Sequence, residues 1–281
     1  MDAQINQIMN SRVPTLTVAF IVVSLVLGFI TPLVIAFFLR KKYKANYPFA
    51  LAGCAVWIVF AMVLKQIAQT LIFITPAGNA ILNNPILLGL FGGAMAGIFE
   101  EVGRFTAFST IFKKKLDNDK NALMYGAGHG GIECILILGF SMISNLAIVL
   151  MINNGMTSQL IEPLKTLDPD TAQSTVNSLI QVIEYPSWMF LVGILERFAA
   201  MASHIAMSVP VWFAVKNKKI SLLFVAIGMH FVLDAGSVIF NSLTGENVLL
   251  VEGLIYLFAI AFVFIAYMIY KNNSSENVAM N

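Results

Sequence analysis

The sequence predicts an all-α integral membrane protein, a polytopic bundle of about seven transmembrane helices. Of its 281 residues, 58% are hydrophobic and only 11% are charged, and the mean hydropathy is +0.82. This composition excludes an ordinary soluble globular protein. A helix needs about 20 apolar residues to cross the ~30 Å hydrocarbon layer, and several such runs are present. The net charge of +2 is too small to indicate a nucleic-acid partner.

Seven apolar runs, taken in chain order, are long enough to be spans. We expect the whole chain, 1–281, to form a single membrane domain. The N-terminal residues lack a basic region, and no A-x-A-like cleavage site follows the first run, which we therefore expect to be a retained span and not a signal peptide. The spans are placed at 14–39, 47–75, 85–112, 121–152, 187–215, 220–243 and 248–270.

Lysine and arginine positions, which did not enter this placement, test it independently. Twelve of the seventeen lie at connections or ends on one side, and only two, Arg12 and Lys165, lie on the other. Because cytoplasmic connections are enriched in these residues, we expect a multi-pass protein of the cell membrane with its N-terminus outside and its C-terminus in the cytoplasm. The twelve fall in RKKYK (40–44), KKKLDNDK (113–120) and KNKK (216–219) and at Lys271.

One connection on the expected outer side is long. Residues 153–186 form an extracytoplasmic loop with four acidic groups and one lysine. Within it, TAQSTVNSLIQVIEY can form an amphipathic helix with Leu179, Val182 and Ile183 on one side. We expect that helix to serve as packing or as a lid. The polar tail after Lys271 is expected to be disordered.

The spans contain an unusual number of ionisable residues. Such a residue at the bilayer centre costs at least ~2.5 kcal/mol on insertion scales, so it needs a partner, a water cavity or a function. With a rise of ~1.5 Å per residue, seven of them on four helices reach a common level, roughly 14–22 Å from the cytoplasmic ends of their spans. The seven are Glu100, Glu101, His129, Glu133, His204, His230 and Asp234. They include every histidine of the protein.

The spacing of these residues gives them an orientation. Glu100/Arg104, His129/Glu133 and His230/Asp234 are i, i+4 pairs, whose members share a helix face. Glycine-rich flanks, LFGGAMAG (90–97) and YGAGHGG (125–131), allow helices to approach closely around them. Glu196 and Arg197 lie nearer the outside and can form a separate pair or a gate. A purely structural polar network is the alternative interpretation, although it is a costly way to join helices.

Peptide-bond hydrolysis inside a membrane needs a water, a base, donors for the oxyanion and an acid for the leaving amine. Glu100 or Glu101 could act as the base, and histidines opposite it could orient the water and stabilise the negative charge. Arg104 could hold one glutamate ionised while the other reacts. These residues supply the groups that such a hydrolysis needs, which makes an intramembrane peptidase one function that they allow.

At these residues the chain resembles known families. Glu100-Glu101 with Arg104, Tyr125-x-x-x-His129 and His230-x-x-x-Asp234 resemble the motifs of the glutamic intramembrane proteases related to CAAX-prenyl endopeptidases and bacteriocin-processing enzymes. Over essentially the whole chain, EEVGRF, GHGGIE and MHFVLDAG look like the signatures of the bacterial YhfC family of intramembrane peptidases.

The resemblance implies that Glu100 activates water together with His129. It also implies that Glu101 and Arg104 support Glu100, and that His230 with Asp234 serves the oxyanion and orienting roles. The chain departs from the CAAX-related pattern at Arg104, which lies one residue closer to the glutamates, and at Asp234, where asparagine is common. The implied substrate is a membrane protein or a lipidated peptide.

His204 has no counterpart in that three-motif pattern, and it raises the question of a metal. His129, His204 and His230 with a glutamate could form a Zn²⁺ site, although no H-E-x-x-H motif is present. Metal-free glutamate catalysis is the favoured expectation and zinc the alternative. Two other functions stay open: a proton- or ion-coupled transporter that uses the same cluster, and a non-catalytic immunity or partner-binding membrane protein.

Overall fold

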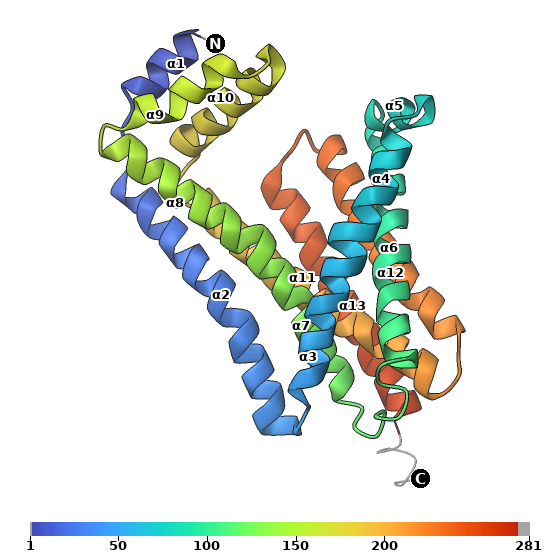
Figure 1. Cartoon of the computed structure of the whole chain (residues 1–281). Helices are drawn as coiled ribbons and strands as arrows, with labels where there is room; N and C mark the ends of the chain where they lie inside the picture. Colours follow the sequence, from blue (N-terminus) through green and yellow to red (C-terminus); the bar gives the residue numbers. More distant parts are fainter. Residues whose placement is uncertain (1, 275–281) are drawn as a thin grey trace. The chain divides into compact units, whose positions relative to one another are not determined.

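The computed structural model describes residues 2–274 and is built from helices, with no strand among the described residues (Figure 1). The predicted fold class is confirmed, because seven helices within the described part of the chain are long and apolar enough to cross a membrane. Each overlaps one of the expected spans. They are Thr15–Tyr43, Tyr47–Phe73, Pro85–Ser109, Asn121–Asn153, Met189–Lys216, Ser221–Leu243 and Val248–Asn273. In the tail for which we expected disorder, Asn272 and Asn273 instead continue the last helix, and residues 275–281 lie outside the described residues.

Two of these spans contain π-helical stretches. The second consists of α3 (Tyr47–Trp57), η1 (Ile58–Leu64) and α4 (Lys65–Phe73). The fourth consists of α7 (Asn121–Cys134), η2 (Ile135–Gly139) and α8 (Phe140–Asn153). The other spans are α2 (Thr15–Tyr43), α6 (Pro85–Ser109), α11 (Met189–Lys216), α12 (Ser221–Leu243) and α13 (Val248–Asn273).

The chain divides into two compact units by its internal contacts, and the single membrane domain that we expected stays a prediction. Unit 1 comprises the chain up to Ile30 and Cys134–Arg197, and unit 2 comprises Thr31–Glu133 and the chain from Phe198 on. Three of the seven spans therefore contribute to both units.

The shorter helices of unit 1 pack around a small core of their own. α1 (Asp2–Met9) lies against α9 (Thr157–Ile161) and α10 (Pro169–Glu184), and η3 (Glu162–Thr166) joins the latter two. Ile8, Val176 and Leu179 are buried in this core. Asp168 caps α10, because its side chain accepts a hydrogen bond from the Thr171 N–H. α10 covers the segment in which we expected an amphipathic helix. The remaining short helix, α5 (Pro76–Leu82), belongs to unit 2.

Glycines allow the helices of unit 2 to pack backbone to backbone. α6 packs along α12, and Gly89, Gly93 and Gly97 share one face of α6 because they lie four residues apart. A Cβ added at Gly93 would lie 2.7 Å from the Phe231 carbonyl oxygen, and one at Gly97 would lie 2.8 Å from the Ile227 carbonyl oxygen. Small residues at these positions let the two helices, and the polar side chains they carry, come close together.

An aromatic cluster holds the other helices of unit 2. The rings of Phe49 (α3) and Phe112 stack with centroids 3.9 Å apart. Phe108 (α6) contacts Trp212 (α11) at 5.2 Å and Tyr125 (α7) at 4.7 Å. All five side chains are buried. Because aromatic rings contribute large apolar areas and preferred contact geometries, this cluster fixes four helices relative to one another next to the polar residues considered below.

The glycine packing predicts opposite effects at two neighbouring positions. Gly93→Ala should lower the free energy of unfolding by about 1–3 kcal/mol, since its new methyl group meets the α12 backbone. Gly92→Ala is the matched control, because a Cβ there would have no neighbour within 4 Å. Since alanine is the better helix former by about 1 kcal/mol, Gly92→Ala should leave stability unchanged or raise it. Thermal unfolding of the detergent-purified variants measures both, and equal effects would contradict the packing argument.

Candidate active site

The eight residues predicted for the site all lie in unit 2 and form one connected group of side chains. They come from four helices, α6, α7, α11 and α12. Six are buried, and Glu133 and Asp234 retain side-chain exposures of 15% and 39%. The group consists of Glu100, Glu101, Arg104, His129, Glu133, His204, His230 and Asp234.

Glu100 contacts groups from three other helices. Its Oε1 accepts a hydrogen bond from Nζ of Lys65 at 2.7 Å. Its Oε2 lies 3.1 Å from Nε2 of His129 and 3.8 Å from Nε2 of His230. A buried carboxylate requires such partners, because leaving its charge unpaired away from water costs several kcal/mol.

Glu101 has a separate set of partners, because adjacent residues on a helix point about 100° apart. Nη1 of Arg104 donates to its Oε2 at 2.6 Å, and Nδ1 of His230 lies 2.9 Å from its Oε1. Both carboxylate oxygens are therefore engaged. We considered from the sequence that Arg104 could hold one of the two glutamates. The guanidinium pairs with Glu101 at i, i+3 and not with Glu100 at i, i+4.

His204 brings the third imidazole to the group. Its ring centroid lies 4.7 Å from that of His129 and 5.4 Å from that of His230. Its Nε2 lies 2.7 Å from Oε2 of Glu133. We expected Glu133 to pair with His129 on its own helix. Glu133 instead contacts His204 on α11, and His129 contacts Glu100 on α6.

The partners of His204 indicate which ring nitrogen carries its proton. Nη2 of Arg104 lies 3.5 Å from Nδ1. A guanidinium can only donate hydrogen bonds, so Nδ1 bears the lone pair and Nε2 carries the proton that faces Glu133. Glu133 thereby fixes the tautomer of His204, as carboxylates commonly do for metal-binding histidines, and a metal ion at Nδ1 would take the place of the 3.5 Å contact with Arg104.

His230 is arranged differently, because both of its ring nitrogens face carboxylates. Nδ1 faces Glu101, while Nε2 lies 3.8 Å from both Glu100 and Asp234. The contact with Asp234 is longer than a hydrogen bond. A ring in this setting is placed to donate hydrogen bonds on both sides and not to offer a lone pair to a cation.

Lys65 is a member of this group that the sequence reasoning left out. It is the first residue of α4, directly after the π-helical η1, and π-helical turns redirect the side chains that follow them and are frequent at functional sites. A lysine alone in an otherwise apolar span was the available signal, since such a charge needs a partner. The sequence did not show which of the carboxylates would be that partner.

Three buried polar atoms around the group have no hydrogen-bond partner within residues 2–274. They are Nε of Arg104, the hydroxyl of Tyr125 and Nδ1 of His129. The Arg104 guanidinium carbon lies 6.0 Å from the centre of the Tyr125 ring. An unsatisfied buried polar group costs about 1–3 kcal/mol, and waters or ligands usually satisfy such groups. These atoms therefore indicate a place for a water or another ligand.

The chemistry of the donors fits a divalent metal ion. Glu100, His129 and His204 each offer one ligand atom, and these atoms lie within 4.8 Å of one another. Two imidazoles and one carboxylate are a ligand set of catalytic zinc sites, which leave a further position for water. For a metal, if one is bound, the sequence suggested His129, His204 and His230 together with a glutamate. The structure places Glu100 with the first two and His230 between carboxylates.

The charges of the group favour the same kind of ion. Among the described residues of the group, four carboxylates face two fixed cations, the ammonium of Lys65 and the guanidinium of Arg104. Buried carboxylates in excess of cations are stabilised by a metal ion, which is often the largest local charge in such a site.

Glu196 and Arg197 form a pair of their own in unit 1. The two adjacent side chains on α11 are joined by a salt bridge between Oε1 of Glu196 and Nη2 of Arg197. This corresponds to the separate pair that we considered from the sequence.

Comparisons with known proteins place the chain among membrane peptidases. A family model described as "YhfC intramembrane metalloprotease" matches residues 23–255, a range that includes the whole polar group. A Bacillus subtilis (strain 168) protein, "Uncharacterized membrane protein YhfC", is 30% identical over 243 residues, which cover 86% of this chain and 92% of the relative. No solved structure matches.

The buried Glu101–Arg104 ion pair predicts a strong and specific loss of stability. Arg104→Leu should lower the free energy of unfolding by about 3–5 kcal/mol, because it leaves a buried carboxylate without its counter-ion. Adding Glu101→Leu to Arg104→Leu should restore part of that loss.

The exposed pair of Lys165 and Glu162 in unit 1 is the matched control, with side chains 67% and 72% exposed. Lys165→Leu should cost less than about 1 kcal/mol. Unfolding of the purified variants in mixed micelles gives the comparison. A loss for Arg104→Leu as small as that for Lys165→Leu would contradict the importance of the buried pair.

Proposed function

Because this chain belongs to the family of YhfC intramembrane metalloproteases, we propose that it hydrolyses a peptide bond of a membrane protein or lipidated peptide at its buried glutamate–histidine group. The observation that carries the proposal is the convergence of Glu100, His129 and His204 within three helices that are long and apolar enough to span a membrane. Burying this group is costly, so a function that requires it is the better explanation.

Glu100, His129 and His204 would hold a divalent cation, with zinc the ion best suited to two imidazoles and a carboxylate. When bound, such an ion lowers the pKa of a coordinated water and polarises a carbonyl group. Glu133 would orient His204 through the Nε2 proton. His230 would stay outside the ligand set, because both of its nitrogens face carboxylates.

Of the two adjacent glutamates, Glu100 is the one that we assign to the site of reaction. As a ligand of the cation it would lie beside the reacting water, and without a cation it would itself accept a proton from that water. Glu101 has one oxygen on Arg104 and the other on His230, which suits a positioning role. His230 and Lys65 both approach Glu100 and would donate hydrogen bonds to the oxyanion of the scissile carbonyl.

Proton transfer to the leaving amine needs a group that can also exchange protons with water. Glu133 and Asp234 are the carboxylates of the group with appreciable exposure, 15% and 39% of their side chains. We assign this transfer to them, and in particular to Asp234, which is more exposed and faces His230.

A metal-free mechanism would use the same residues, with Glu100 as the base that activates water and His129 as its partner. The contact between Glu100 and His129 supports it equally. Metal content distinguishes the two mechanisms.

We also propose that the N-terminus lies outside and the C-terminus in the cytoplasm, since the twelve-to-two distribution of lysine and arginine supports this orientation.

Metal analysis of the purified protein is the first test. Wild type should carry about one divalent ion per chain, and both His129→Asn and His204→Asn should lose it. His230→Asn is the matched control and should keep the ion. If His230→Asn loses the ion while His204→Asn keeps it, the assignment of ligands is wrong. Metal-free wild type that still cleaves would favour the glutamate mechanism.

Cleavage of single-span reporter proteins in proteoliposomes tests the activity. Glu100→Gln should abolish cleavage, and Asp234→Asn should lower the rate by about 10²–10⁴ with the metal retained. Glu162→Gln is the control. It changes an exposed carboxylate that does not belong to the glutamate–histidine group, so it should leave the cleavage rate unchanged. Wild-type cleavage by Glu100→Gln would refute the proposal. Proton-coupled flux without cleavage, lost in Glu100→Gln, would favour a transporter.

Single cysteines test the orientation in a background lacking Cys54 and Cys134. With a membrane-impermeant maleimide, Asp170→Cys should be labelled in intact cells, whereas Lys115→Cys should be labelled only after permeabilisation. The reverse pattern would overturn the proposed orientation.

A further inference from the structure

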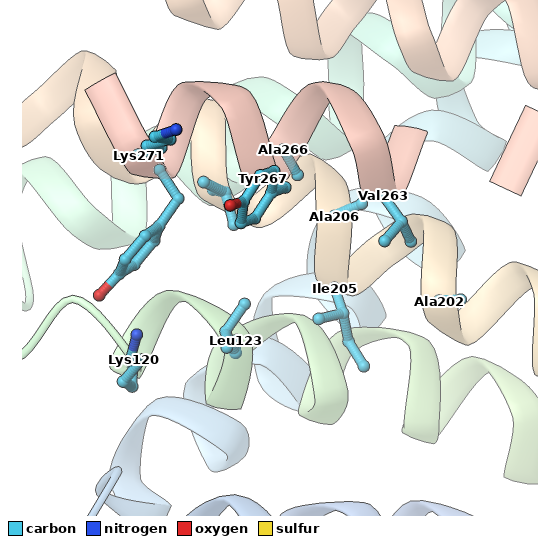
Figure 2. A pocket seen from close by; sticks show the side chains of 11 residues that line it. Lys120, Leu123, Ala202, Ile205, Ala206, Val263, Ala266, Tyr267 and Lys271 are labelled. Carbon is cyan, nitrogen blue, oxygen red and sulfur yellow. The ribbon is translucent and has the colours of Figure 1, made fainter. Parts of the chain in front are cut away.

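A cavity of about 660 Å³ lies between α7, α11 and α13 of unit 2 (Figure 2). Ala202, Ile205, Ala206 and Val209 line it from α11. These residues follow i, i+3, i+4, i+7 spacing and so form one stripe of that helix. His204 lies outside the stripe, so the cavity faces a different side of α11 from the catalytic histidine.

The cavity is basic at one end and apolar at the other. Lys120 and Lys271 lie at the same end in Figure 2, whereas Ala202 and Val263 lie at the opposite end. Nζ of Lys120 is 4.0 Å from the centre of the Tyr270 ring, which also lines the cavity. Lys271 and Val263 are eight residues apart on α13, which corresponds to about 12 Å along the helix.

The cavity opens toward the outer surface of the helices. Tyr267 is 60% exposed and Val263 is 49% exposed, and both line the cavity. Because both are exposed residues of a helix that can span a membrane, we expect this surface to face lipid. Its basic end coincides with the ends of the spans that carry most of the lysine and arginine residues, near the boundary between hydrocarbon and headgroups.

We propose that this cavity binds an anionic phospholipid. Lys120 and Lys271 would contact the phosphate, and an acyl chain would lie along Leu123, Ile205 and Val263. Basic pockets between transmembrane helices commonly bind acidic headgroups in this way. A free phosphate would leave the apolar end unoccupied, and a zwitterionic lipid would gain less from two lysines. The inference does not depend on the proposed peptidase function.

The lipid would bridge the helices that carry His129 and His204, since α7 and α11 both line the cavity. Its binding should therefore stabilise the folded protein against heat, because a ligand that binds only the folded state raises the free energy of unfolding.

Native mass spectrometry and thermal unfolding in detergent test the proposal. The probes are dioleoyl phosphatidylglycerol, dioleoyl phosphatidylcholine and inorganic phosphate. Phosphatidylglycerol should remain bound and raise the unfolding temperature, whereas the other two should do neither. Lys120→Gln/Lys271→Gln should weaken its binding by roughly 30-fold, since each lysine near the headgroups contributes about 1 kcal/mol.

Two matched controls separate the site from general effects. Lys114→Gln/Lys115→Gln removes the same charge from exposed residues that do not line the cavity and should bind lipid like wild type. Val263→Trp should block the acyl-chain end, whereas Ile260→Trp, at a position outside the cavity and 67% exposed, should not.

The proposal would be overturned if phosphatidylcholine were retained as well as phosphatidylglycerol, or if inorganic phosphate raised the unfolding temperature as much as phosphatidylglycerol does. It would also be overturned if Lys114→Gln/Lys115→Gln lost as much affinity for phosphatidylglycerol as Lys120→Gln/Lys271→Gln. Unchanged phosphatidylglycerol binding in Val263→Trp would overturn it as well. Should Lys120→Gln/Lys271→Gln fail to fold, the two tryptophan variants still decide the question.

Discussion

The constraint on which this structure depends is that buried carboxylates must be paired. Glu100 and Glu101 are both almost completely shielded from solvent, and the charge of each would cost several kcal/mol if left alone. Every oxygen of the two side chains has a partner, drawn from Lys65, Arg104, His129 and His230. Because these partners come from four helices, pairing the charges also determines how those helices assemble. The polar group is therefore both the candidate site and a structural centre of unit 2.

Close helix packing makes that pairing possible. The side chains that meet are of ordinary length, so their helices must approach nearly to backbone contact. A Cβ added at Gly128 of α7 would lie 2.0 Å from the carbonyl oxygen of Ala50 on α3. Gly93 and Gly97 likewise allow the backbone of α6 to approach that of α12 closely. The glycines and the charged residues are thus two parts of one arrangement, since the charges are held together by the close contacts that the glycines allow.

The fold class and all members of the polar group except Lys65 could be predicted from the sequence, whereas the partners within the group could not. Hydropathy identifies spans, and a constant rise per residue places Glu100, His129 and His230 at one depth. Periodicity also gives the face of each residue, but it does not say which helix lies opposite. For that reason the contact of Lys65 with Glu100 was not foreseen. Within α6, both Glu100 and Glu101 lie within reach of Arg104, and spacing alone does not show that the guanidinium pairs with Glu101. The division into two units was likewise not visible, because the same helices contribute to both.

The π-helical stretch before Lys65 has a consequence of its own. The seven residues Ile58–Leu64 form a π-helix, which has more residues per turn than an α-helix. The direction in which the side chain of Lys65 points therefore depends on how many residues that stretch contains. Shortening it by one would turn the ammonium away by about 100°, one residue's rotation of an α-helix, without altering any side chain that touches Glu100. The direction of this charge is therefore encoded in the length of an apolar segment, and a sequence that kept every polar residue could still lose the contact.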